Sequence, residues 1–299
     1  MSSVSEVGKT SISVKTNSAR RNTIQTLGFS GLTILAILTV LPILFVVVYI
    51  FVKGISAISI DFLTGFPTDG MRSGGIWPAI LGTVLLTFGT AIAAMPLGIA
   101  AAIYLSEYAP DNRWTRIIRI SIISLAGIPS VVYGLFGLGI FVLSLKMGTS
   151  ILAASLTLGI MTLPVVISTS EEALRAVPQS FRVVSISMGG TQWQTIRRIV
   201  LPQSVSGILT GVILGLERAA GETAPILFTG AAFYLPTLPN SPMDQTMALP
   251  YHLYVIATQV PGMPTDIMFG TALVLLFLVL SLNLLATIIR SRARRRRMW

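Results

Sequence analysis

Long uncharged apolar runs, separated by short charged stretches, make up most of the chain. Roughly 20 residues of helix cross the hydrocarbon core of a bilayer, and each run is at least that long. The pattern therefore predicts an all-α fold with six transmembrane helices, over residues 27–52, 77–105, 120–145, 147–170, 203–229 and 267–289. Pro96 is a candidate break in the second helix, and Pro129 interrupts the third.

The runs divide the chain into three parts. Residues 1–26 form a polar tail, residues 27–290 form the six-helix transmembrane domain, and residues 291–299 form a basic tail. In the first tail, Gly8-Lys9-Thr10 ends like a phosphate-binding loop, but Ser3 stands where that loop requires its first glycine. We therefore expect no ATP hydrolysis by this chain.

A charged segment over residues 171–202 lies between the fourth and fifth runs and has an apolar face of its own. Phe181, Val184 and Met188 recur at helical spacing and form one apolar stripe. Gly189 or Gly190 can take the left-handed conformation that ends a helix. The first half of the 171–202 segment is thus predicted to hold a short amphipathic helix.

A second short helix is predicted in the same segment. It begins with the T-x-x-Q capping box over residues 191–194, and Pro202 is expected to end it. Trp193, Ile196 and Val200 share one of its faces. The two helices would form a basic amphipathic unit at the membrane surface, which suits docking into a groove of a soluble partner. An ordinary pair of interfacial helices is the alternative.

Positive charge is distributed according to the side of the membrane. Only 11% of the residues are charged, whereas a soluble domain has about 25%. With the N-terminus inside, 17 Lys and Arg residues fall in inside segments, and only Lys53, Arg72 and Lys146 fall outside. The positive-inside rule therefore predicts a multi-pass protein of the plasma (inner) membrane with both termini and the 171–202 segment in the cytoplasm. The net charge of +10 follows this distribution, so we expect contact with the lipid bilayer and no nucleic-acid partner.

The sequence offers little enzyme chemistry. It has no cysteine and a single histidine, His252, which excludes disulfides, thiolate sites and His-rich metal sites. It also has no paired acidic metal motif. We therefore expect no catalytic residue, no metal site and no enzyme activity.

Three charged residues lie inside the fifth apolar run. The run has a ridge of small residues, four positions apart, that lets another helix approach closely: Gly207, Gly211, Gly215 and Ala219. Arg218 and Glu222 form the next row, so they face a helix interface or a cavity rather than lipid. Glu217 points about 100° away from Arg218 on the same helix.

Arg218 is the candidate for substrate contact, with Glu222 and Glu217 as further residues of a substrate path. An arginine at mid-bilayer costs at least about 2.5–3.5 kcal/mol, so something must compensate for it. Its guanidinium fits phosphate or carboxylate oxygens, and a protonated phosphate can donate to a nearby carboxylate, whereas sulfate has no such donor. The alternative is an Arg218–Glu222 ion pair that neutralises itself and only fixes the helix packing.

Several motifs resemble a known family. Gly189, then nine residues, then Ile199-Val200-Leu201-Pro202 is similar to the cytoplasmic signature of ABC importer membrane subunits, although Val183-Val184-Ser185 stands at its EAA positions without the acidic residue. Residues 216–229, which contain R-x-x-G-E-T-A-P, resemble the PstA family, the permease subunits of bacterial phosphate importers. Residues 128–136 and 101–108 are also similar to that family.

The resemblance implies the helix bundle of a type I ABC importer permease, with cytoplasmic coupling helices in the 171–202 segment. Such a subunit moves inorganic phosphate into the cytoplasm together with a second homologous permease, two ATPase subunits and an extracytoplasmic phosphate-binding protein. ATP and magnesium would be bound by the ATPase subunits, and no cofactor by this chain. Candidate contacts with the ATPase are Phe181, Gly189, Gly190, Trp193, Ile199, Leu201 and Pro202.

Two other functions remain open at this point. A permease for another oxyanion, such as molybdate or sulfate, would have the same architecture and a different pocket. A secondary transporter or channel acting alone would transport without ATP, and it predicts an internal repeat, of which the sequence gives no convincing sign.

Overall fold

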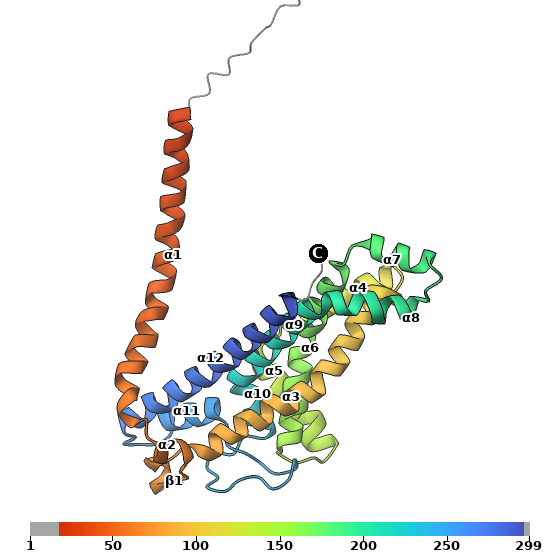
Figure 1. Cartoon of the computed structure of the whole chain (residues 1–299). Helices are drawn as coiled ribbons and strands as arrows, with labels where there is room; N and C mark the ends of the chain where they lie inside the picture. Colours follow the sequence, from red (N-terminus) through yellow and green to blue (C-terminus); the bar gives the residue numbers. More distant parts are fainter. Residues whose placement is uncertain (1–17, 296–299) are drawn as a thin grey trace, which may run out of the picture. The chain divides into compact units, whose positions relative to one another are not determined.

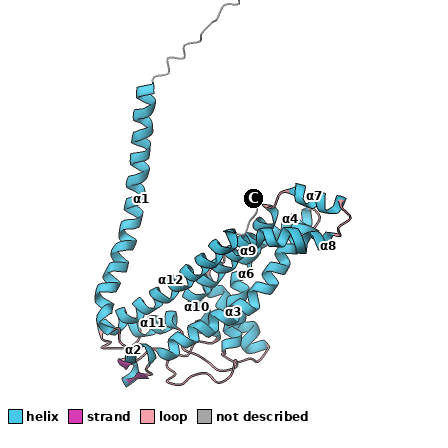
Figure 2. Cartoon of the chain, in the orientation of Figure 1, coloured by secondary structure: helices cyan, strands magenta, loops and turns pink. Residues whose placement is uncertain are grey.

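The computed structural model describes residues 18–295, and most of them are helical (Figure 2). Residues 1–17 and 296–299, which include Gly8-Lys9-Thr10 and the end of the basic tail, lie outside the described part. The chain divides into two units, residues 1–49 and 50–299. Residues 18–49 of the helix α1 (Ser18–Gly54) make up the described part of the first unit, and the last residues of α1 belong to the second.

Helix extends into both segments that were predicted as tails. α1 begins at Ser18, and the last helix, α12 (Thr265–Arg295), ends at Arg295. Residues 18–26 and 291–295 are therefore helical, and the division into a cytoplasmic tail, a transmembrane domain and a basic tail stays a prediction. Forming the first turn of a helix is unfavourable, but the apolar run is already helical, so the flanking residues only extend an existing helix. Arginine has a high helix propensity and favours this extension.

The second unit begins with small elements and continues as helices. The small elements are η1 (Ile55–Ala57), α2 (Ile60–Thr64), β1 (Pro67–Thr68), η2 (Asp69–Met71) and β2 (Ser73–Gly74), with β1 and β2 paired antiparallel. The helices before α12 are α3 (Trp77–Ile103), η3 (Tyr104–Tyr108), α4 (Arg113–Ala126), α5 (Ser130–Gly137), η4 (Leu138–Ser144), α6 (Ile151–Arg175), α7 (Gln179–Ser187), α8 (Gln192–Thr195), η5 (Ile196–Val200), α9 (Leu201–Gly221), α10 (Ala224–Thr229) and α11 (Leu249–Thr258). α4, α7 and α8 lie at one end of this unit, and α2 and β1 at the other (Figure 1).

The long helices match the predicted spans in position with one exception, and the fifth differs in its bounds. Five helical stretches of the described chain are long and apolar enough to cross a membrane: Gln25–Ala57, Trp77–Tyr108, Ile151–Arg175, Gln192–Gly221 and Thr265–Arg292. The exception is the third predicted span, where α4 and the stretch Ser130–Ser144 are bent by 100°. The number of spans is six if this bent pair counts as one broken span.

Two prolines behave differently from each other. Pro129 breaks the third span as predicted, because it has no backbone N–H and because the residue before a proline avoids the helical conformation. Pro96 was the other candidate break, and that prediction was wrong, since α3 runs through it. A proline costs a helix one hydrogen bond, which transmembrane helices tolerate.

The fifth predicted span ends earlier than expected. α9 stops at Gly221, the chain is extended at Glu222, and the short α10 follows. In a continuous helix, residue 225 would donate its N–H to the carbonyl of Gly221, and Pro225 has none to donate. The connection between the fifth and sixth predicted spans also contains a helix, α11, whose first residues are buried.

The predicted small-residue ridge of α9 is confirmed as a packing surface, and α6 is the helix that lies on it. A Cβ atom added at Gly207 would collide with Ala173, and one added at Gly211 would collide with Thr169. At Gly215 the added atom would lie 3.1 Å from Val166. Because α3 also packs along α6, these three helices form the centre of the bundle and set the position of the charged residues on α9.

Candidate functional site

Arg218 and Glu222 form an ion pair at the end of α9. Arg218 Nε lies 3.4 Å from Glu222 Oε1, and the two side chains are 34% and 17% exposed. Glu222 follows Arg218 by four residues, a spacing that brings two side chains together on a helix. The helix ends at Gly221, so the backbone of Glu222 itself is extended. No hydrogen bond from either terminal nitrogen of Arg218 is found within residues 18–295. Part of the guanidinium fork is thus open to another anion.

The pair lies at a junction of several helices. Arg218 lies in the last turn of α9, just before the chain becomes extended at Glu222. Glu222 borders a very small cavity of about 10 Å³, together with Thr83 of α3 and residues of α6 and α11. The two charged residues therefore lie among protein elements, as the sequence predicted, rather than on a face that only lipid could cover.

Glu217 lies apart from this pair and faces α12. The side-chain amide of Asn283 in α12 is directed at the Glu217 carboxylate, and its nitrogen is the group that can donate there. Glu217 also borders an apolar cavity of about 220 Å³ with residues of α3 and α12. The structure thus brings together two of the three predicted substrate-path residues. Asn283 could have been found as the one amide in the middle of an apolar run.

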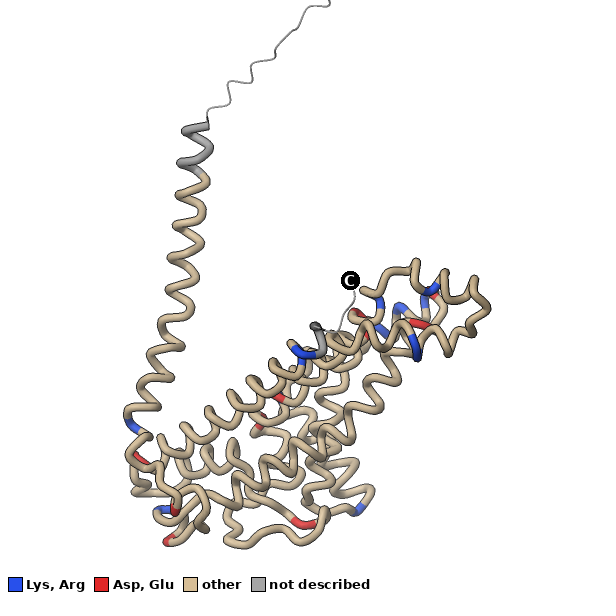
Figure 3. The backbone as a smooth tube through the Cα atoms, in the orientation of Figure 1, with Lys and Arg blue, Asp and Glu red and all other residues tan. Residues whose placement is uncertain are grey.

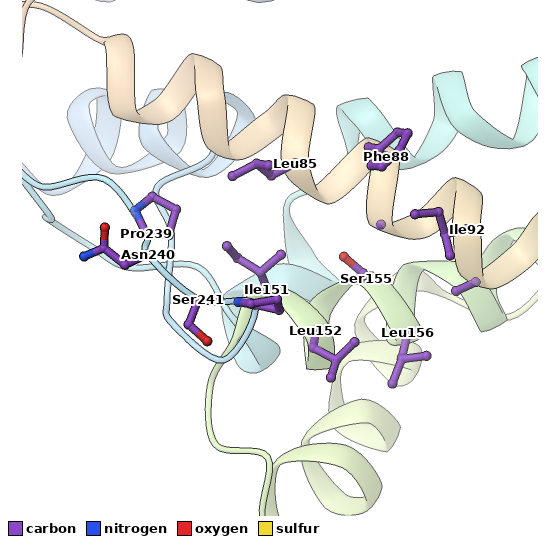
Figure 4. Close-up of a pocket in the computed structure, with 13 residues that line it drawn as sticks. Leu85, Phe88, Ile92, Ile151, Leu152, Ser155, Leu156, Pro239, Asn240 and Ser241 are labelled. Carbon is purple, nitrogen blue, oxygen red and sulfur yellow. The ribbon is translucent and has the colours of Figure 1, made fainter.

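A larger cavity lies between α3 and the first turns of α6. It has a volume of about 490 Å³, and the loop over residues 239–242 closes one side (Figure 4). Leu85, Phe88 and Ile151 are among its mainly apolar lining residues. The hydroxyl of Ser155 points into this region without a hydrogen-bond partner in the described chain. Among the described residues, no charged side chain lines this cavity, so it offers an oxyanion no counter-charge.

The 171–202 segment has the two short helices that the sequence predicted. α7 ends at the turn where Gly189 takes the left-handed conformation, with φ of 85°. The second helix, α8, begins with the predicted capping box, in which Thr191 and Gln194 bond to each other's backbone N–H groups. This segment is also where the positive charge of the second unit gathers, at the end that carries α4, α7 and α8 (Figure 3).

Pro202 does not end the second helix, and that prediction was wrong. Helix runs without a break from Gln192 to Gly221. Pro202 lies in the first turn of α9, directly after η5, whose wider turns bond Leu201 N–H to the carbonyl of Ile196. The helix therefore continues through Pro202 and loses one backbone hydrogen bond there, which transmembrane helices tolerate.

The residues predicted to contact an ATPase have different exposures. Trp193 is 53% exposed, and Gly189 and Pro202 are exposed as well. Ile196 and Val200, predicted on the same face as Trp193, are buried. The remaining candidates are partly buried: Phe181, Gly190, Ile199 and Leu201. Other exposed apolar residues of the 171–202 segment are Val183, Val184, Ile186 and Met188.

Two groups of ion pairs at this end were not predicted from the sequence. Glu107 in η3 pairs with Arg182 in α7 at 2.7 Å. Glu171 in α6 pairs with both Arg119 in α4, at 2.7 Å, and Arg175, at 3.0 Å. The only sequence signal was that acidic and basic residues occur in neighbouring charged stretches, and this does not identify pairs that are 75 or 52 residues apart.

Known proteins with similar sequences are permeases. Residues 94–297 match the family described as binding-protein-dependent transport system inner membrane component. The chain is 33% identical over 254 residues to the probable ABC transporter permease protein YqgI of Bacillus subtilis (strain 168), covering 80% of this chain and 85% of that protein. It is 33% identical over 285 residues to the phosphate transport system permease protein PstA 1 of Mycobacterium tuberculosis (strain CDC 1551 / Oshkosh), covering 93% and 91%.

The fold is similar to that of solved ABC transporters. One of them is an inward-facing conformation of the MetNI methionine ABC transporter, with a TM-score of 0.59 and 17% identity, covering 72% of this chain and 94% of that chain. The fold class predicted from the sequence is therefore confirmed. The chain belongs to the family of binding-protein-dependent transport system inner membrane components, which are transport permease subunits.

Proposed function

We propose that this chain is the permease subunit of an ATP-driven importer that moves inorganic phosphate into the cytoplasm. The observation that carries the proposal is the Arg218–Glu222 pair, which presents a partly open guanidinium beside a carboxylate inside the bundle. A guanidinium binds phosphate oxygens, and a carboxylate accepts the proton that phosphate keeps near pH 7. The likeness to permeases named for phosphate transport supports the same substrate.

The proposed assembly has four kinds of member. A second homologous permease would complete the membrane part, and two ATPase subunits would bind ATP and magnesium and dock on the 171–202 segment. An extracytoplasmic phosphate-binding protein would deliver the substrate. The family description supports a binding-protein-dependent system of this kind. This chain would hold no cofactor and hydrolyse no ATP itself.

Purification of the chain from membranes tests this assembly. We expect an ATPase subunit to co-elute with it, and we expect vesicles containing the complex to take up phosphate only when ATP is supplied. Phosphate flux through the purified chain alone, without ATP, would instead identify a secondary transporter or a channel.

The proposed topology places both termini and the 171–202 segment in the cytoplasm. Since the chain has no cysteine, a thiol reagent labels only a cysteine that is introduced, and this shows on which side of the membrane that position lies. Ser187→Cys and Thr237→Cys both replace exposed residues, one in α7 and one in the loop before α11. We expect an impermeant maleimide added to intact cells to label the Thr237→Cys variant and not the Ser187→Cys variant. Labelling of the Ser187→Cys variant from outside would reverse the orientation.

A further inference from the structure

The helix α7 has few attachments to the rest of the bundle. None of the residues of Gln179–Ser187 is buried. Phe181 is partly buried against the core formed around Leu174 and Val177, and the Ser185 hydroxyl lies 2.7 Å from that of Thr195 in α8. An exposed helix with so little apolar burial depends on polar contacts for its orientation.

Arg182 supplies most of these polar contacts. Its Nε and one terminal nitrogen donate to the two carboxylate oxygens of Glu107, at 3.0 and 2.7 Å. The same side chain also donates to the backbone carbonyls of Val177, at 2.7 Å, and Leu174, at 2.9 Å. Only 12% of the Arg182 side chain and 6% of the Glu107 side chain are exposed. This is a bidentate, buried and fully engaged guanidinium, unlike that of Arg218.

Glu107 is held from a second side by α8. The side chain of Gln192 donates to the backbone carbonyl of Glu107 at 2.6 Å. Both short helices of the 171–202 segment are therefore fastened to η3, which directly continues α3. The same α3 carries Thr83, which borders the small cavity beside Glu222. α3 thus connects the cytoplasmic end of the bundle with the region of the Arg218–Glu222 pair.

We propose that the Glu107–Arg182 ion pair is the contact through which movement of α7, driven by the ATPase, reaches α3 and the substrate path. This inference rests on the proposed function. Glu107 and Arg182 are positioning residues in this account: neither touches substrate, and they act by keeping α7 and α3 in a fixed relation. Loss of either partner leaves a buried charge unpaired and frees α7 to move without α3.

A double-mutant cycle on the assembled transporter tests the ion pair. Glu107→Gln, Arg182→Gln and the double variant would be reconstituted with their partner subunits, and phosphate transported per ATP hydrolysed would be measured. We expect each single change to lower this ratio about tenfold, and the double change to lower it no further, because both act through one contact. Arg116→Gln, at an exposed arginine of α4, is the matched control and should keep the ratio of the unchanged complex.

The outcomes separate this inference from the proposed function. If the unchanged complex transports no phosphate, the proposed function fails, whatever the variants do. If it does transport, the ion-pair proposal is overturned when the single variants couple as well as Arg116→Gln, or when the two losses multiply in the double variant. It is also overturned if all three variants fail to assemble, since the pair then only holds the fold. A single variant that fails to assemble, with assembly restored in the double variant, supports the pairwise contact.

Discussion

Replacing Arg218 by glutamine is expected to abolish phosphate transport while leaving the complex assembled. Glutamine is polar, but it is shorter than arginine and has neither the charge nor the planar fork that binds two phosphate oxygens. Arg218 Nε is 3.4 Å from Glu222, a looser contact than the 2.7 Å of the pairs made by Arg182 and Arg119. A substrate anion can replace the Glu222 carboxylate as the partner of a loosely held guanidinium. The same replacement is harder when the guanidinium is tightly held.

The strength of this test lies in its comparison variants. Arg218→Lys keeps the charge and loses the fork, so we expect transport to fall strongly there too. Glu217→Gln removes a charge from the same turn of α9 on the side that faces α12, and we expect a smaller effect. Transport rate and complex yield would be measured together for all three. Normal transport by Arg218→Gln, or a failure explained entirely by poor assembly, would show that the Arg218–Glu222 pair is structural.

Changing Glu222 to glutamine is expected to weaken the discrimination between phosphate and sulfate. The Glu222 carboxylate can accept the proton of phosphate, which sulfate lacks, whereas an amide offers a donor that suits either anion. A hydrogen bond to a charged group contributes about 1.5–3 kcal/mol, so the preference for phosphate should fall roughly 10- to 100-fold. Competition between labelled phosphate and unlabelled sulfate during uptake measures this preference.

Two results would contradict this role of Glu222. One is an unchanged preference for phosphate in an assembled and active Glu222→Gln complex. The other is a loss of assembly or stability alone, which a carboxylate that only neutralises Arg218 would produce. Glu217→Gln is again the matched control, because it removes a carboxylate five residues before Glu222 without changing the Arg218–Glu222 contact.

Local chemistry explains which features the sequence could predict. The capping box at Thr191 and the left-handed Gly189 depend on neighbouring residues, and both were predicted. The Arg218–Glu222 pair follows from a spacing of four on one helix and was predicted in the same way. The end of α9 at Gly221 could also have been predicted, because Pro225 has no N–H to continue the helix. The predicted fifth span nevertheless included both α9 and α10.

The features that could not be predicted from the sequence depend on contacts beyond the neighbouring residues. Pro96, Pro129 and Pro202 all lie within or next to apolar runs, yet only Pro129 breaks a helix. Helix continues on both sides of Pro96 and of Pro202. The Glu107–Arg182 pair joins residues 75 positions apart, and no periodicity links them. Likewise, Trp193 and Val200 were predicted on one helical face, but only Val200 belongs to the core around Leu174 and Val177, and Trp193 is exposed.

Uptake of labelled phosphate by vesicles that contain the complete reconstituted complex tests the central claim most directly. The binding protein would be supplied on the outside and ATP on the inside, with sulfate or molybdate added in excess as competitors. The account predicts uptake that requires ATP, that persists in the presence of either competitor, and that is lost in the Arg218→Gln complex. Uptake of sulfate or molybdate in preference to phosphate, or equal phosphate uptake without ATP, would contradict it.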